Sequence, residues 1–188
     1  MNSQTVTVYD VIRPASRWME IPFLITFNLL LVACAYVTIL LPFSPVPITG
    51  QTFGVLLVAM VLGRVRGTAV VVAYVAEGLA GLPVFAGGSG GMHILFGPTG
   101  GYLIGFVAAA YLAGWLSEKG WDRSIFRSSV AMLIGYVIIF AFGLLALGRF
   151  VPTSALLMAG LWPFMPGMIA KICLACWMLP VARKFVSR

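Results

Sequence analysis

Between two long apolar regions the chain reads Gly81-Leu-Pro-Val-Phe-Ala-Gly-Gly-Ser-Gly-Gly-Met-His-Ile-Leu-Phe-Gly-Pro-Thr-Gly-Gly101, with eight glycines and two prolines. Each glycine inside a helix costs about 1 kcal/mol relative to alanine, so we do not expect a spanning helix here. Apolar side chains are interleaved with the glycines, which is unlike a polar linker. Irregular backbone beside a bilayer persists only where protein buries it or where it lines a wet cavity. We therefore expect a structured loop at the mouth of a helix bundle, with its backbone groups open to a small polar ligand.

The composition of the whole chain is that of an integral membrane protein. Its 188 residues are 61% hydrophobic and 9% charged, with a mean hydropathy of +1.05, whereas soluble domains carry roughly 25% charged residues. We expect an interfacial N-terminal segment at residues 1–20, without a removable signal peptide, and one membrane domain at residues 21–188. The formal charge of +7 does not indicate nucleic-acid binding, because the basic residues form short clusters beside apolar runs.

The apolar runs predict an all-α bundle of six transmembrane helices. The expected spans are about 21–41, 52–63, 68–80, 99–116, 128–147 and 166–182. At ~1.5 Å per residue, the second and third runs are short for a bilayer core of ~30 Å. They can cross if the loops at 42–51 and 81–101 dip into the bundle. The first of these loops contains three prolines, so we expect extended backbone there.

The distribution of basic residues predicts the orientation of this bundle. With the N-terminus inside, ten of the 12 Lys and Arg residues fall on the inner side, and only Arg149 falls in an outer loop. This positive-inside pattern predicts a multi-pass protein of the cytoplasmic (inner) membrane with both termini inside. The loops at 42–51 and 81–101 then share the outer face, which predicts an outward-facing pocket covered by the Gly-rich loop.

Lys171 lies inside the last expected span, five residues after Pro166. An ammonium group within a span is costly and is a candidate functional site. The N-terminus of the helix adds partial positive charge on the same side. The Lys171 ammonium and this helix end together favour an anionic group such as a carboxylate. Two structural alternatives are an ion pair with Glu77 and a lysine that snorkels to the interface. Glu77 could also accept a hydrogen bond from a ligand or be protonated.

Several neutral polar side chains flank the two outer loops. Thr49 and Gln51 can both donate and accept hydrogen bonds, which suits an uncharged polar ligand group, although Thr49 could instead cap the next helix. Ser89 offers similar groups within the Gly-rich loop. We interpret His93 as a loop hydrogen-bonding residue rather than a catalyst, and we expect Asn28 to bond a neighbouring helix.

No catalytic or metal-binding motif is evident in the sequence. It contains no phosphate-binding loop, no nucleophile elbow and no paired metal-ligand motif. Cys173 and Cys176 have redox-like spacing, but we interpret them as small buried hydrophobic residues. We expect no enzyme activity, metal or cofactor, and uphill transport would need an energy source in a partner. Autonomous channels and intramembrane enzymes are alternatives, but the former needs a continuous polar path and the latter a second catalytic group.

Three motifs resemble the BioY family, the biotin-binding S components of energy-coupling-factor vitamin transporters. They are Pro45-Val-Pro-Ile-Thr-Gly-Gln-Thr-Phe-Gly-Val-Leu-Leu57, Gly81-Leu-Pro-Val-Phe-Ala-Gly-Gly-Ser-Gly-Gly91 and Leu95-Phe-Gly-Pro-Thr-Gly-Gly-Tyr102. The resemblance implies capture of biotin from the outer face. It also implies partnership with a transmembrane coupling protein and with cytoplasmic ATPase subunits that hydrolyse ATP. An S component for another small vitamin is the alternative within this class.

The resemblance further implies a site made by the outer loops and the last helix, with the terminal lysine near the biotin carboxylate. The implied substrate-binding residues are Thr49, Gln51, Ser89, Gly90, Gly91, Tyr102 and Lys171. The sequence departs from the family pattern at two places. Met168 stands where family members often have Asp, and the first span has Ala33, Cys34, Ala35 and Thr38 in place of the usual Ala-x-x-x-Ala coupling surface.

Overall fold

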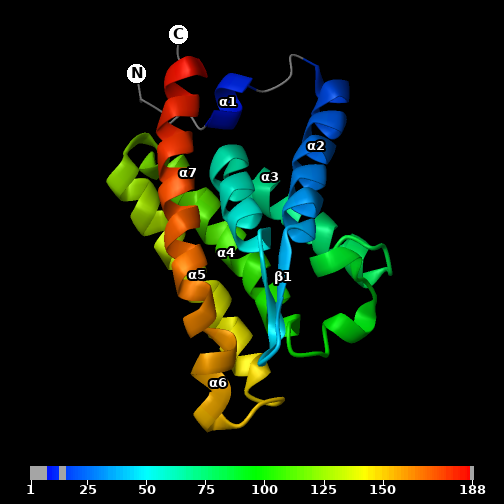
Figure 1. Ribbon diagram of the computed structural model, residues 1–188. Helices are drawn as coiled ribbons and strands as arrows, with labels where there is room; N and C mark the ends of the chain where they lie inside the picture. Colours follow the sequence, from blue (N-terminus) through cyan, green and yellow to red (C-terminus); the bar gives the residue numbers. More distant parts are fainter. Residues whose placement is uncertain (1–7, 13–15, 187–188) are drawn as a thin grey trace.

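The computed structural model describes residues 8–12 and 16–186, and most of this chain is helical (Figure 1). The helices are α1 (Val8–Ile12), α2 (Arg17–Tyr36), α3 (Gln51–Leu79), α4 (Gly100–Glu118), α5 (Ile125–Leu147), α6 (Thr153–Gly160) and α7 (Met165–Val186). Single 3-10 turns are η1 (Ala86–Gly88), η2 (Met92–Ile94), η3 (Trp121–Arg123) and η4 (Trp162–Phe164). An antiparallel hairpin of β1 (Thr38–Leu41) and β2 (Ser44–Thr49) follows α2. The predicted segment at 1–20 is described only in part, because residues 1–7 and 13–15 lie outside these ranges.

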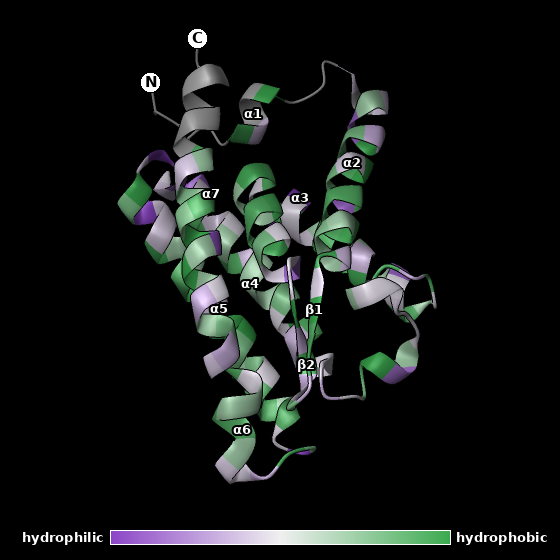
Figure 2. Cartoon of the chain, in the orientation of Figure 1, coloured by the Kyte–Doolittle hydropathy of each residue, from purple (hydrophilic) through white to green (hydrophobic). Residues whose placement is uncertain are grey.

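Five helical stretches of the described chain are long and apolar enough to cross a membrane. They are Trp18–Tyr36, Gln51–Leu79, Gly100–Glu118, Ile125–Leu147 and Thr153–Leu179. The helix bodies are mainly hydrophobic, and the stronger hydrophilic patches fall mainly at helix ends and in connections (Figure 2). The α4 helix is central, because 67% of the residues in its most apolar stretch are buried. The α2 helix is peripheral, because only 11% of the corresponding residues are buried. The described chain is therefore a helical membrane bundle with α4 inside and α2 at its edge.

The helix α3 is broken at Gly63, whose φ of 79° and ψ of −177° are not helical. The chain turns back at this point, because a Cβ atom placed on Gly67 would lie 2.7 Å from the Ala59 Cα. Gly114 of α4 packs against the same turn, since a Cβ atom placed on Gly114 would lie 2.7 Å from the Arg64 backbone nitrogen. Glycine permits both the positive φ and the close approach of three backbones. The two short runs predicted at 52–63 and 68–80 are thus two arms of α3 that lie side by side.

The hairpin corrects two details of the sequence prediction. The first span was expected to continue to residue 41, but α2 ends at Tyr36 and residues 38–41 form β1, so the bundle is not entirely α-helical. The β1 strand pairs with the proline loop, with Thr38 opposite Thr49 and Ile39 opposite Ile48. Prolines fix extended backbone in the second strand, as predicted. Thr38–Leu41 is as apolar as the helix before it, so composition alone did not reveal the change from helix to strand.

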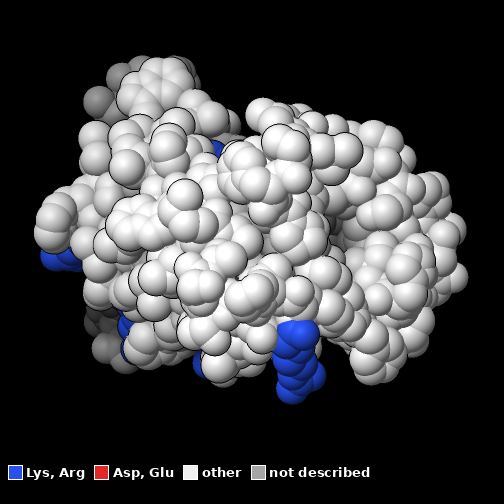
Figure 3. Space-filling model, turned by 60° about the horizontal axis from the view of Figure 1, so that its bottom comes forward, with Lys and Arg blue, Asp and Glu red and all other residues white. Residues whose placement is uncertain are grey.

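The two ends of the bundle differ in charge. At the end that carries the α3 turn, the Arg66 Nε lies 2.7 Å from a Glu20 carboxylate oxygen, and the Arg64 Nε lies 3.8 Å from Glu118. The Arg66 guanidinium also lies 4.0 Å above the Tyr9 ring. Burial, reinforced by a hydrogen bond to Glu20, raises the pKa of Tyr9, which therefore remains a donor. The face that Figure 3 turns toward the viewer is largely uncharged, with blue basic side chains mainly near its rim and no acidic side chain in view.

Candidate functional site

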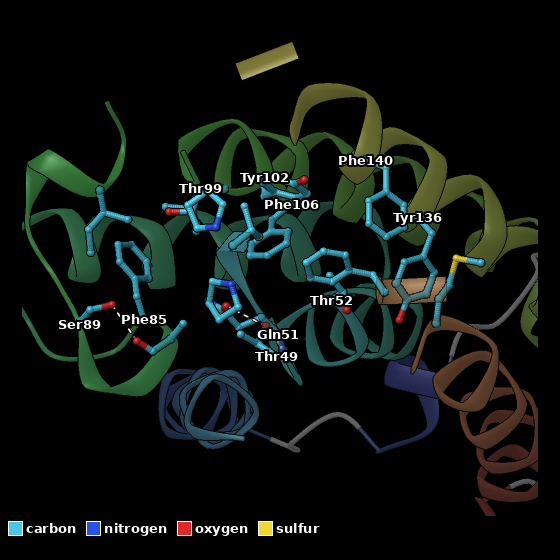
Figure 4. Close-up of a pocket in the computed structure, with 18 of the residues that line it drawn as sticks. Thr49, Gln51, Thr52, Phe85, Ser89, Thr99, Tyr102, Phe106, Tyr136 and Phe140 are labelled. Atoms are coloured by element: carbon cyan, nitrogen blue, oxygen red, sulfur yellow. Dashed lines mark hydrogen bonds between the residues drawn. The ribbon is translucent and has the colours of Figure 1, made fainter. Parts of the chain in front are cut away.

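A cavity of about 260 Å³ lies in the half of the bundle away from the α3 turn (Figure 4). The α4 helix fixes this position, because its first residues line the cavity while Glu118, at its last turn, pairs with Arg64. The polar and ionisable lining residues are Thr49, Gln51, Thr52, Ser89, His93, Thr99, Tyr102, Tyr136 and Lys171. The apolar lining residues are Pro45, Val46, Pro47, Phe85, Ala86, Ile94, Leu103, Phe106, Phe140, Phe164 and Met168. Segments that are far apart in sequence therefore converge on one hollow.

Lys171 reaches from α7 to the start of α3. Its Nζ donates to the Thr49 carbonyl oxygen at 2.6 Å and to the Thr52 hydroxyl oxygen at 3.3 Å. Among the described residues, no Asp or Glu lines the cavity. Its ammonium group is therefore solvated by neutral oxygens, and an anionic ligand group would find a cation without a carboxylate partner.

Glu77 lies elsewhere and does not pair with Lys171. The Asn28 Nδ2 donates to the Glu77 Oε1 at 3.1 Å, joining α2 to the second arm of α3. This bond confirms the prediction that Asn28 contacts a neighbouring helix. Within the described ranges, Glu77 does not line the cavity, so the alternative of an ion pair with Lys171 is not formed in this structure.

Thr49 and Gln51 form a buried network at the start of α3. The Thr49 hydroxyl donates to the Gln51 Oε1 at 3.0 Å and accepts from the Gln51 backbone nitrogen at 3.2 Å. The Gln51 Nε2 donates to the Tyr74 hydroxyl at 2.6 Å, which in turn donates to the Val84 carbonyl at 3.0 Å. Thr49 thus bonds the helix start and also lines the cavity, so its bond to the helix leaves the predicted contact with a ligand open. The network connects both arms of α3 with the Gly-rich segment.

The Gly-rich segment folds into a defined wall. The Ser89 side chain lines the cavity and donates to the Ala86 carbonyl at 2.8 Å. Gly90 and Gly91 do not line it. A Cβ atom on Gly90 would overlap the Leu82 carbonyl oxygen, and Gly91 has a φ of 111°. These two glycines therefore shape the backbone that presents Ser89.

Tyr102 lines the cavity from the first turn of α4, with only 6% of its surface exposed. Its hydroxyl donates to the Gly160 carbonyl at 2.9 Å, which attaches α6 to the bundle. The Tyr102 and Phe140 rings lie edge to face at an angle of 88°. Tyr102 consequently offers its ring to the cavity, while its hydroxyl is engaged within the protein.

Sequence reasoning missed most of the apolar wall and three hydroxyl groups. Phe106 and Phe140 line the cavity, but an aromatic residue in an apolar helix can equally face lipid or core. Thr52, Thr99 and Tyr136 also sit within or beside helices, where their direction depends on packing. Pro45 and Pro47 belong to the first of the three motifs. Their position in the outer loop could have indicated that they line the cavity.

The arrangement suits binding rather than bond-breaking chemistry. One cation, several hydroxyls and an amide face a largely aromatic and aliphatic hollow. In the part of the chain that the structure describes, no group of three or more His, Cys, Asp or Glu residues could hold a metal ion. Such a site fits a small ligand with an apolar body, a neutral polar group and an acidic group.

Comparison with known proteins agrees with this geometry. The BioY family pattern matches residues 8–188. The biotin transporter BioY of Thermotoga maritima is 44% identical over 125 residues, covering 66% of this chain and 72% of that protein. BioY of Rhizobium etli is 36% identical over 145 residues, covering 72% and 76%. A solved structure of the S-component for biotin from an ECF-type ABC transporter has a TM-score of 0.80 at 26% identity, covering 91% of this chain and 95% of that one. The chain belongs to the BioY family.

Proposed function

We propose that the chain captures biotin as the substrate-specific subunit of an energy-coupling-factor transporter and serves its uptake across the cytoplasmic membrane. Family membership and similarity to a biotin S-component support this function. The observation that carries it is the cavity itself, in which Lys171 faces neutral polar groups and apolar walls, with no Asp or Glu among the lining residues that the structure describes. The chain is a transporter subunit and not an enzyme, so ATP hydrolysis belongs to separate ATPase subunits.

In the proposed complex, the biotin carboxylate lies at Lys171 and the fused rings extend along the aromatic wall. Gln51, Thr49 and Ser89 supply donors and acceptors for the ureido group, which requires both. Tyr102 supplies ring surface, while Gly90 and Gly91 hold the loop in place. Met168 lines the cavity one turn before Lys171, so it adds apolar surface where many relatives have an acid.

The proposed membrane arrangement has six crossings with both termini inside. Each arm of α3 makes one crossing, and the α3 turn lies at the cytoplasmic side with Arg64 and Arg66. The hairpin and the Gly-rich segment then lie at the outer side, where biotin arrives. The clustering of ion pairs at one end and of the cavity toward the other supports this orientation.

The partners in this proposal are biotin, membrane lipid, a transmembrane coupling protein and cytoplasmic ATPase subunits, with no nucleic acid. The exposed Ala33 of α2 marks a variant surface for the coupling protein, whereas Ala35 is buried inside the bundle. Uptake of labelled biotin by cells without their own transporter should rise when this chain is expressed with those subunits. Equal uptake with catalytically inactive ATPase subunits would contradict energy coupling.

Biotin binding itself is tested by calorimetric titration of the detergent-purified protein. We expect saturable binding of biotin and none of riboflavin or thiamine. Binding of another vitamin in place of biotin would redirect the proposal to a different substrate. If the folded protein binds none of the three, the capture function is wrong.

A further inference from the structure

Tyr136 differs from the other buried tyrosines of the cavity region. The Tyr74 and Tyr102 hydroxyls each donate to a backbone carbonyl. The Tyr136 hydroxyl is fully buried and makes no hydrogen bond of standard geometry among the described residues, although the Thr52 hydroxyl is a neighbour and the residue lines the cavity. Its side chain as a whole is only 1% exposed. Buried polar groups are nearly always paired in folded proteins, so this hydroxyl requires an explanation.

The hydroxyl is aimed at the polar side of the cavity. Tyr136 projects from α5 toward Thr52 at the start of α3, and the two hydroxyl groups are neighbours (Figure 4). The Tyr136 ring stacks on Phe140, with centroids 6.1 Å apart and an angle of 26°. Stacking fixes the ring and therefore the direction of the hydroxyl. A phenylalanine at this position would keep the stack and lose only the oxygen.

The neighbouring groups are donors as well. The Thr52 hydroxyl oxygen accepts from Lys171 at 3.3 Å, which leaves its own hydrogen to donate to the neighbouring Tyr136 oxygen or, when a ligand is bound, to a ligand oxygen. The Lys171 ammonium has three hydrogens, and the structure gives acceptors for two of them. Tyr136 adds a third donor group. No carboxylate lines this cavity among the described residues to accept from them.

We infer that Tyr136 and Thr52 complete, with Lys171, a three-donor site for the carboxylate of the bound ligand. The inference rests on the proposed function and identifies which side chains recognise the acid. A carboxylate has two oxygens and about four lone-pair positions, so it can accept from all three groups. Met168 and Phe140 flank these donors with apolar surface, and low polarity strengthens hydrogen bonds to a charged acceptor. Tyr136 and Thr52 are thus specificity-determining residues that favour the acid over its neutral derivatives.

The test compares Tyr136→Phe with the intact protein for biotin and for biotin methyl ester. Loss of a hydrogen bond to a charged group predicts a fall in biotin affinity of roughly 10- to 100-fold. Affinity for the ester should change by less than about threefold, because the charge that strengthens the bond is absent. The ligand-free variant should melt at the same temperature as the intact protein or higher, since an unpaired buried hydroxyl has been removed. A purely structural role would predict the opposite thermal shift.

Matched variants complete the experiment. Tyr111→Phe removes an exposed hydroxyl of α4 outside the cavity and should alter neither affinity nor melting temperature. Thr52→Val should lose affinity for biotin but not for its methyl ester, as Tyr136→Phe does. Thr52→Ser keeps the hydroxyl and should therefore keep biotin affinity. An intact protein that fails to bind biotin would refute the proposed function. An intact protein that binds biotin while Tyr136→Phe binds it equally, or loses acid and ester alike, would overturn this inference and leave the function standing.

Discussion

The two ends of the bundle treat their charged residues in opposite ways. At the α3 turn, Arg66 pairs with Glu20 and Arg64 pairs with Glu118. In the cavity, Lys171 is held by the neutral oxygens of Thr49 and Thr52. Charges that satisfy one another stabilise the packing of helices, whereas a cation held only by neutral groups remains able to bind an external anion. One end of the bundle is therefore held by ion pairs and the other carries the proposed binding cavity, so variants at the two ends should have different effects.

The largest effect is expected for Lys171→Ala. Loss of the cation that faces the ligand carboxylate should reduce biotin affinity by about 100-fold or more. The matched control is Lys119→Ala, because Lys119 lies near the α3-turn end, with its ammonium 5.6 Å from the Trp115 ring. Calorimetric titration of both variants with biotin and its methyl ester measures the difference. Equal affinity of the intact protein for acid and ester would contradict the assignment of Lys171 to the carboxylate.

The next effect concerns the backbone of the Gly-rich wall. Gly90→Val forces a side chain into the Leu82 carbonyl, so the loop must move and biotin binding should be lost while the bundle stays folded. Gly167→Ala is the control, since a Cβ atom there meets nothing within 4 Å. Titration and thermal melting report binding and folding separately. Retained affinity in Gly90→Val would show that the position of this loop does not matter for the ligand.

A smaller effect is expected for Tyr74→Phe. This change removes the link between Gln51 and Val84, so it leaves the Gln51 amide and a loop carbonyl without their partner. We expect a loss of about 1–3 kcal/mol in stability and a several-fold fall in biotin affinity through a looser wall. Thermal melting with and without biotin measures both. An unchanged melting temperature would show that the network is not what holds the Gly-rich segment to α3.

The smallest effect is expected at the end held by ion pairs. The Arg66 and Glu20 side chains are 41% and 31% exposed, so their coupling in a double-mutant cycle should be about 1 kcal/mol or less. Biotin affinity should be unchanged in Arg66→Ala, Glu20→Ala and the double variant. High salt should weaken the coupling. A marked loss of biotin affinity in Arg66→Ala would remove the distinction between the two ends.

Much of the site was predictable from residues whose chemistry conflicts with their surroundings. Lys171 within a span, the prolines before α3 and the glycines of residues 81–101 each violate the pattern of an apolar helix, and each belongs to the cavity or its wall. The end of α2 and the contacts of Phe106 were not predictable, because an apolar residue has the same signal in a helix, a strand or a cavity wall. Gly90 was predicted as a substrate-binding residue, but the sequence did not reveal that its backbone lies too close to the Leu82 carbonyl to admit a side chain. Tyr136 gave no signal, since only packing reveals that its hydroxyl is unpaired.

The cavity joins parts of the chain that are made at very different times. The Lys171 ammonium bonds the Thr49 carbonyl across 122 positions, and the Ser44 hydroxyl bonds the Ala159 carbonyl across 115. Because the chain is synthesised from its N-terminus, the hairpin and the Gly-rich segment are made before α7. The cavity is complete only when α7 is also in place. A ligand that binds only the finished cavity stabilises the full-length fold by mass action. A nascent chain that ends before α7 lacks Lys171, so stabilisation by a ligand of the cavity is expected only for the chain that includes α7.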